Sequence, residues 1–239
     1  MSGVASESRQ LPLSVRLRDA ATFAAFEPGD NGAVLAWLQG HIGAGPERGW
    51  LWGPVGSGRS HLLQAACHAA VDRGLRAIYL PAEELVTDAP AVLEGLEHCG
   101  LVALDDLGEL AGHRRAELAL FDLCNRLAEQ GGLLLAAASA APLSHAWTLA
   151  DLASRLAAAA VFRLRPLNDA TKLVALQRRA KLRGLELPTA TARFILSRAD
   201  RRPEALFELL DELDLASLVA QRRLTVPFVR KLLAQRSTS

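Results

Sequence analysis

Long hydrophobic runs are missing from this sequence of 239 residues, although 50% of its residues are hydrophobic. The best candidate, Leu133–Ala138, is far shorter than the ~18 apolar residues that a membrane-spanning helix needs. The N-terminus also lacks the charged-then-apolar pattern of a secretory signal. The composition therefore predicts a globular protein without a membrane partner, and we expect it to be cytoplasmic.

Cysteine and lysine are also scarce. Cys67, Cys99 and Cys124 are far apart and form no C-x-x-C pair, which argues against a disulfide framework or a zinc ribbon and fits a reducing cytosol. Of the 27 basic residues, all but Lys172, Lys181 and Lys231 are arginine. Compositional drift can therefore explain an arginine that stands where other proteins carry lysine.

The net charge of +1 conceals an uneven distribution. Residues 1–162 hold 11 basic and 18 acidic residues, whereas residues 163–239 hold 16 basic and 8 acidic ones. This split favours two modules that meet at an acidic/basic seam, or an anionic ligand between them, although a solvated arginine-rich helix face would give the same pattern. Near-neutrality overall argues against strong sequence-independent DNA binding.

Short apolar stretches alternate with helical patterns through the first two thirds of the chain. Strands are predicted at 50–53, 77–80, 101–104, 133–138 and 161–164, and helices at 59–73, 83–98 and 116–129. Asp30 or Asn31 can cap an earlier helix that carries Val34 and Leu38. This alternation predicts an α/β fold with a mostly parallel five-stranded sheet covered on both faces.

Beyond Pro166 no strand pattern recurs. Residues 168–183, 189–198, 203–220 and 226–235 all have helical patterns, separated by glycine and proline. The sequence therefore predicts an N-terminal segment over residues 1–18, an α/β nucleotide-binding domain over 19–166 and a small all-helical domain over 167–239.

Residues 53–60, Gly-Pro-Val-Gly-Ser-Gly-Arg-Ser, lie between a predicted strand and a predicted helix. Their spacing is that of a phosphate-binding P-loop, with Arg59 at the usual lysine position. The glycines let consecutive backbone N–H groups surround phosphate oxygens, and the helix N-terminus adds partial positive charge. Ser60 is placed to ligate Mg²⁺. A glycine-rich turn without a ligand is the weaker alternative.

The arginine within this P-loop affects the expected chemistry. A guanidinium is larger than an ammonium group and planar, so Arg59 should preserve phosphate binding but degrade the geometry for transfer of the γ-phosphate. Two carboxylates, Asp105 and Asp106, follow the apolar stretch 101–104. In P-loop enzymes the first holds magnesium through water and the second can polarise an attacking water. We expect those roles for Asp105 and Asp106 here.

With these motifs in place, the chain resembles the AAA+ ATPases, and within them the DnaA/Hda branch. The residues that carry the resemblance run nearly from end to end: 10–15, 23, 26, 28–31, 58–63, 151–156, 166–167, 172–173, 200–201 and 224–229. Initiators of the DnaA type are longer and end in a helix-turn-helix DNA-binding domain. The resemblance therefore favours a regulator over an initiator.

The resemblance implies a parallel AAA+ sheet, a helical lid, and bound ADP or another nucleotide with Mg²⁺. Arg155 falls where the family carries an arginine finger that acts in trans, and Arg201 where it carries the lid arginine called sensor 2. Ser139 stands at the sensor 1 position, which is usually Asn or Asp. The implied cofactor-binding residues are Gly53, Pro54, Gly56, Ser57, Gly58, Arg59, Ser60, His61, Ser139 and Arg201.

Residues 10–15 resemble a sliding-clamp-binding peptide, with Gln10, Leu11, Leu13 and Val15 as its docking residues. The resemblance implies a regulator of replication initiation that stimulates hydrolysis of DnaA-bound ATP. Its expected partners are DnaA, the β sliding clamp of DNA polymerase III, DNA through that clamp, and a second copy in a dimer. Nucleoid association during replication would follow.

Several alternatives remain open. The chain could be an ATPase that hydrolyses its own ATP, such as a helicase loader, using Asp105 and Asp106, or a DNA-binding module that uses its basic C-terminal part. Arg155 could be a structural arginine paired with Asp151 or Asp122. Arg201 could lie in a solvated pair with Arg202, and residues 10–15 could form an edge strand.

Overall fold

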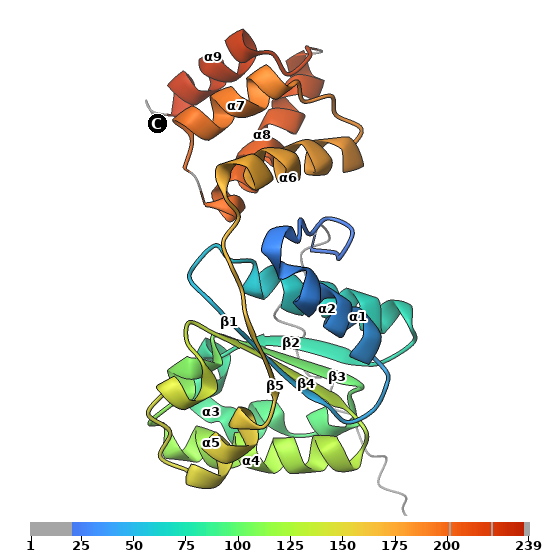
Figure 1. Ribbon diagram of the computed structural model, residues 1–239, viewed down its shortest axis with the longest axis vertical. Coiled ribbons are helices and arrows are strands. Elements are labelled where there is room, and N and C mark those ends of the chain that lie inside the picture. The colour runs from blue at the N-terminus through green and yellow to red at the C-terminus, as the bar shows by residue number, and fades with distance from the viewer. Residues whose placement is uncertain (1–20, 201, 221, 237–239) are drawn as a thin grey trace, which may run out of the picture.

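The computed structural model describes residues 21–200, 202–220 and 222–236 (Figure 1). Five parallel strands form one sheet in the order β2-β3-β4-β1-β5. The predicted fold class is confirmed, and each predicted strand lies within two residues of an observed one. The strands are β1 (Arg48–Trp52), β2 (Ala77–Pro81), β3 (Leu101–Asp105), β4 (Leu133–Ala138) and β5 (Ala160–Arg163).

Burial explains the apolar character of the central strand β4 and its neighbour β3, whose only polar residue is the final Asp105. Every residue of β3 and β4 is buried, because helices cover both faces of a parallel sheet. The edge strand β5 instead alternates between half-buried and exposed residues. The carboxyl ends of the parallel strands meet at one edge of the sheet, which places the segments after β1 and β3 at the same end of the molecule.

Helices cover the two faces of the sheet as two layers (Figure 1). α1 (Gly32–His41) and α2 (Arg59–Asp72) pack on one face around Leu51 and Leu63. The other face is covered by α3 (Glu83–Leu93), α4 (Arg114–Glu129) and α5 (Ala150–Ala157). Short 3₁₀ turns lie at η1 (Gly29–Asn31), η2 (Leu96–His98), η3 (Leu107–Leu110) and η4 (Pro142–Ser144).

The helical pattern predicted over residues 83–98 is wrong in its continuity. The backbone leaves the helical region at Asp88 (φ −151°, ψ 66°), and a separate 3₁₀ turn covers residues 96–98. Pro90 lacks an N–H donor, and its ring clashes with the carbonyl group four residues earlier, which breaks a regular helix. Gly95 adopts φ 79°, a left-handed conformation that separates the two pieces.

The lid consists of the four helices after β5: α6 (Asp169–Leu182), α7 (Thr189–Arg198), α8 (Pro203–Ala220) and α9 (Val226–Arg236). It has its own core, in which Leu176, Leu210 and Val229 are fully buried. The side chain of Asn168 caps α6, because its Oδ1 accepts a hydrogen bond from the Thr171 N–H at 2.9 Å. Pro166 lies in the segment that connects β5 to α6.

Asn31 connects the two ends of the α/β region. It is the N-cap residue of α1, one of the two residues predicted for that position, but its side chain makes no capping hydrogen bond there. Its Nδ2 instead donates to the Arg165 carbonyl at 2.9 Å, and its Oδ1 accepts from the Arg165 N–H at 2.8 Å. The buried amide thus satisfies both backbone groups of a residue in the connection to the lid.

Ion pairs support the same junction. Arg165 lies 3.5 Å from Asp30, and Arg178 of α6 lies 3.4 Å from Glu27. The segment before α1 is thus joined both to the connection before the lid, through Arg165, and to α6 of the lid, through Arg178.

All three cysteines are buried as free thiols. Burial raises the pKa of the Cys124 thiol to about 11, which leaves it protonated and unreactive near neutral pH. Within the described residues no helix is both long and apolar enough to cross a membrane.

Candidate functional site

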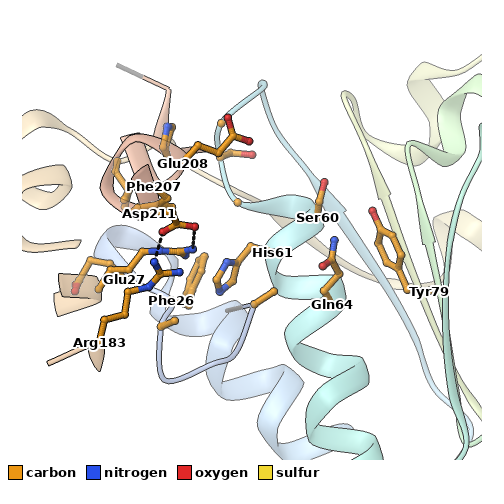
Figure 2. A pocket seen from close by; sticks show the side chains of 18 residues that line it. Phe26, Glu27, Ser60, His61, Gln64, Tyr79, Arg183, Phe207, Glu208 and Asp211 are labelled. Atoms are coloured by element: carbon orange, nitrogen blue, oxygen red, sulfur yellow. Dashed lines mark ion pairs between the residues drawn. The ribbon is translucent and has the colours of Figure 1, made fainter. Parts of the chain in front are cut away.

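A cavity of about 630 Å³ lies between the sheet's carboxyl edge and the lid (Figure 2). Its size is within the roughly 300–1,000 Å³ range of small-molecule sites. Most of its lining comes from residues 56–64, from the segment 21–27 before α1, and from α6, the residue Arg183 after it, and α8 of the lid. Tyr79 of β2 and Leu167 complete the lining. The predicted site residues that line it are Gly56, Ser57, Gly58, Ser60 and His61.

The glycines of residues 53–60 are required by the local backbone. Gly56 and Gly58 have φ of 78° and 91°, where side chains cause strain. A Cβ atom at Gly58 would lie 2.8 Å from the Phe26 ring, and one at Gly53 would lie 2.6 Å from the Leu164 carbonyl oxygen. The loop therefore has the tight backbone path that lets N–H groups surround an anion.

Two buried polar atoms at this loop lack a hydrogen-bond partner among the described residues, Ser57 Oγ and Arg59 Nη1. Buried polar groups in folded proteins are almost always paired. Both atoms belong to the loop whose spacing predicted phosphate binding. Their lack of a partner points to a polar ligand at this position.

Arg59 points toward the end of β3. Its Nη2 lies 3.1 Å from Asp106 Oδ1, and its side chain is only 11% exposed. Burial and the neighbouring Asp105 raise the pKa of Asp106, while Arg59 acts in the opposite direction. Asp106 has φ 50°. The structure thus brings the predicted base and the P-loop arginine into one ion pair.

Asp105 is buried, and both of its carboxylate oxygens are engaged. Oδ1 accepts from the Asp106 N–H at 3.0 Å, and Oδ2 accepts from the Tyr79 hydroxyl at 2.8 Å. Burial, together with Asp105, raises the pKa of Tyr79, so the hydroxyl stays protonated as a donor. Sequence reasoning missed Tyr79. Its signal was that the only tyrosine of the chain lies near the end of β2, the strand beside β3.

The lid side of the cavity carries charges that are paired within the lid. Asp211 lies 3.6 Å from Arg179 and 2.6 Å from Arg183, and Arg179 stacks over the Phe207 ring at 4.7 Å (Figure 2). Glu208 also lines the cavity. These residues were not predicted as site residues. The sequence feature that could have indicated them is the four-residue spacing of Arg179 and Arg183, which places both arginines on one helix face.

The remaining wall comes from the segment before α1. His61 Nε2 donates to the Thr22 carbonyl at 3.0 Å, and the rings of His61 and Phe26 lie 5.6 Å apart. Ala21 and Ala25 contribute small side chains. These contacts attach the segment to the start of α2 and leave an apolar wall next to the polar loop.

Comparison with known proteins finds one match to the lid and several to most of the chain. Residues 169–233 match the family model of the Hda lid domain. Domain III of the Thermotoga maritima replication initiation protein DnaA superimposes with a TM-score of 0.76, covering 92% of this chain and 98% of that one at 21% identity. The chain has a DnaA-like AAA+ fold and an Hda lid domain.

Two further structures share this AAA+ fold. DnaA from Aquifex aeolicus bound to AMPPCP has a TM-score of 0.69 at 22% identity, with 84% of this chain and 67% of that one covered. The RuvB Holliday junction branch migration motor of Thermotoga maritima has a TM-score of 0.63 at 18% identity, with 88% and 72% covered.

In this AAA+ fold, Arg155 lies on α5, outside the cavity lining. Its guanidinium stacks over the Phe121 ring of α4 at 5.0 Å from the ring centroid. No carboxylate of the described residues forms an ion pair with it, including Asp151 and Asp122. The alternative of a structural arginine paired with either aspartate is therefore not observed. Arg155 is half-buried, with one side available to solvent.

The other site residues implied by the AAA+ resemblance do not line the cavity or lie outside the described residues. Ser139 directly follows β4, is exposed, and lies outside the cavity lining, as do Gly53, Pro54 and Arg59. Arg201 and the docking residues Gln10, Leu11, Leu13 and Val15 lie outside the described residues. Their roles stay predictions.

The donors near the cavity suit Mg²⁺, which prefers oxygen ligands and usually keeps several waters. Ser60 is exposed at the start of α2 and lies on the same side of the cavity as Tyr79, whose hydroxyl binds Asp105 (Figure 2). No cluster of three His, Cys, Asp or Glu side chains that could hold a metal occurs among the described residues. A magnesium ion here would depend on phosphate oxygens and water to complete its shell.

Proposed function

We propose that this chain is a nucleotide-bound regulator of replication initiation that stimulates hydrolysis of DnaA-bound ATP by inserting Arg155 into the partner's site. The observation that carries the proposal is the position of Arg155, which lies outside its own cavity and forms no ion pair with a carboxylate of the described residues. An arginine placed there can reach a phosphate of a neighbouring molecule but not one in its own P-loop.

The cavity supports nucleotide binding. Phosphates would lie at residues 56–60, where the glycine backbone and the unpartnered Ser57 Oγ are found. The apolar wall around Phe26 suits a nucleobase. The solved DnaA structure with the same fold contains AMPPCP, an ATP analogue, which agrees with an adenine nucleotide here. We propose ADP with Mg²⁺ held through Ser60 and, by way of water, Asp105; the ion would neutralise phosphate charge.

The same geometry makes this chain a poor ATPase. Both oxygens of Asp105 are engaged within the chain, and Asp106 is paired with Arg59. The Asp106 oxygen that faces Arg59 is already engaged, so it is not free to orient an attacking water. The site is therefore better suited to hold a nucleotide than to cleave it.

Arg155 would supply charge stabilisation in the partner's site. A guanidinium positioned against the transferring phosphoryl group accelerates phosphoryl transfer by about 10³–10⁵. We propose that the clamp on DNA recruits the chain through residues 10–15, which brings Arg155 to DnaA. A dimer of the chain would cover Arg155 until recruitment.

The test is the rate of DnaA–ATP hydrolysis in the presence of DNA-loaded clamp. We expect Arg155→Ala to lower the stimulated rate by about 10³, with ADP affinity and clamp binding unchanged. Arg114→Ala, which removes another exposed arginine from the same layer of helices, is the matched control and should retain full stimulation. Full stimulation by Arg155→Ala would overturn the proposal.

The second candidate is an ATPase that cleaves its own nucleotide. It is favoured by the raised pKa of Asp106, caused by burial and Asp105, which suits a proton acceptor. Purified protein alone should then turn over ATP in repeated cycles, and Asp106→Asn should abolish that turnover. Absence of turnover in the wild-type chain would exclude this candidate.

A further inference from the structure

Glu117 is a carboxylate with no exposed surface. It lies in the first turn of α4 and forms no ion pair with a basic side chain of the described residues. A buried carboxylate is costly unless hydrogen bonds compensate for the lost water. The hydrogen-bond donors that compensate for this lost water therefore indicate the structural role of Glu117.

Those donors come from two backbone segments. Oε1 accepts from the Gly112 N–H at 2.8 Å, just before α4. Oε2 accepts from the Thr148 N–H at 2.9 Å, the Thr148 hydroxyl at 2.9 Å and the Leu149 N–H at 2.7 Å. Although burial alone would raise it, these hydrogen bonds together hold the pKa of Glu117 below its ordinary value. The side chain stays ionised and connects the two segments.

Thr148 and Leu149 directly precede α5, which begins at Ala150. Leu149 is the N-cap residue of that helix, and no side chain of its own caps it. Backbone N–H groups at a helix start need acceptors, and a carboxylate is favoured there by the helix dipole. Glu117 therefore caps α5 from outside and fixes where and in which direction that helix begins.

Phe121 contacts the other end of α5. It follows Glu117 by one helical turn, so both side chains lie on the same face of α4. The guanidinium of Arg155 stacks over the Phe121 ring at 5.0 Å. Leu152 and Leu156, on the intervening turn of α5, are buried in the core. α4 thus holds the eight-residue helix just before its first residue and at its arginine (Figure 1).

We propose that Glu117 and Phe121 are positioning residues that set the pose from which Arg155 reaches a partner's nucleotide. Glu117 fixes the backbone of α5, and Phe121 fixes the plane of the guanidinium without neutralising its charge. The inference rests on the proposed function, since it names how the chain presents the arginine finger.

The experiment measures DnaA–ATP hydrolysis against the concentration of the chain, with DNA-loaded clamp, and separates the maximal rate from the half-maximal concentration. Phe121→Leu keeps an apolar side chain but removes the aromatic face, and should lower the maximal rate about twofold to fivefold. Phe121→Trp should retain the wild-type rate. The half-maximal concentration should not change, because Phe121 sets orientation and not docking.

Glu117→Gln should have the larger effect, about tenfold, because an amide presents a donor to backbone N–H groups that need an acceptor. Amide hydrogen exchange at Thr148 and Leu149 should become faster in this variant and stay unchanged in Phe121→Leu. If Glu117→Gln does not fold, Thr148→Val, which removes only the hydroxyl contact, takes its place with a smaller loss.

A matched control is available in the lid. Arg230 stacks over the Phe194 ring at 5.5 Å, so Phe194→Leu removes a contact of the same kind elsewhere and should leave the maximal rate unchanged. Wild-type maximal rates in both Phe121→Leu and the folded variant at Glu117 or Thr148 would overturn the inference. If Arg155→Ala also kept full stimulation, the proposed function would fail with it; if Arg155→Ala lost stimulation, only the positioning role would fail.

Discussion

Arg59 and Arg155 lie in opposite surroundings, although the sequence predicted that each of them acts on phosphate. Arg59 lies in the P-loop, outside the cavity lining, is 11% exposed and is paired with Asp106 at 3.1 Å. Arg155 lies on the α4–α5 face and stacks on the Phe121 ring, with no carboxylate of the described residues paired to it. One guanidinium is neutralised within its chain, and the other keeps its full charge.

This difference matters for phosphoryl transfer. An arginine that must leave a carboxylate before it binds phosphate loses an ion pair, whereas one that leaves an aromatic face loses much less. Stacking also suits arginine because its guanidinium is weakly hydrated. The molecule therefore combines a cavity that is suited to hold a ligand with a separate face that is suited to act on another molecule.

The largest expected effect comes from Arg155→Lys, which keeps the charge but loses the planar fork. Because a lysine cannot make the two parallel hydrogen bonds of a guanidinium, stimulation of DnaA–ATP hydrolysis should fall by about 10²–10³. ADP affinity, measured by calorimetry, should not change. A lysine variant as active as wild type would show that charge alone suffices on this face.

A tenfold effect is expected at the other arginine. Arg59→Lys replaces a planar group by a compact charge that fits between phosphates and frees Asp106, so the chain's own ATP hydrolysis should rise about tenfold. Single-turnover hydrolysis without partners measures this, with the stimulation of DnaA as the control that should stay constant. An unchanged rate would mean that the arginine reflects the lysine-poor composition of the chain.

Tyr79→Phe tests the role of Asp105, the carboxylate next to the Arg59–Asp106 ion pair. Loss of the hydroxyl leaves a buried oxygen of Asp105 without its 2.8 Å donor, which should lower the free energy of unfolding by about 1 kcal/mol. Urea denaturation measures the loss, and it should be smaller in the presence of Mg²⁺ and ADP. Equal losses with and without the ligands would argue against a metal near Asp105.

The smallest effects concern pH, and they have opposite signs in the two regions. The folded-state pKa of Glu117 is lowered from its ordinary value of 4.5. Its contribution to stability is therefore fully present above pH 4.5 and is lost as the pH falls through the lower folded-state pKa. The folded-state pKa of Asp106 is raised from its ordinary value of 3.8. Stability therefore declines as the pH rises from 3.8 toward the higher folded-state pKa. Urea denaturation of Glu117→Gln and Asp106→Asn between pH 3 and 7 measures these slopes, and each variant should lose only the slope of its own residue.

Much of the fold could be predicted from local patterns. The five strands are short apolar stretches bounded by turn residues, and helices α7 and α8 begin and end at the predicted residues. The P-loop was recognisable because glycine spacing fixes a backbone path. In each case the decisive information lies within a few neighbouring residues.

The contacts that organise the candidate site could not be predicted in this way. Glu117 lies on the apolar face of α4, three residues before Leu120, but local spacing could not reveal its acceptor role, which depends on backbone donors 31 and 32 residues away. Tyr79 and Asp105 meet only because β2 and β3 are neighbours in the sheet. Asn31 was interpreted as a helix cap, whereas its partner lies 134 residues later. Tertiary pairing overrides local preference at all three positions.

The Asn31 contact also orders events during synthesis. Its two hydrogen bonds close a loop of 134 residues, so a growing polypeptide cannot form them until β5 and the residue that follows it have left the ribosome. The entropy of closing so long a loop has to be offset by the intervening core, which must assemble first. The junction to α6 is thus completed late, and a nascent chain gains its ligand cavity, whose lining extends to Asp211, only after α8 has been synthesised.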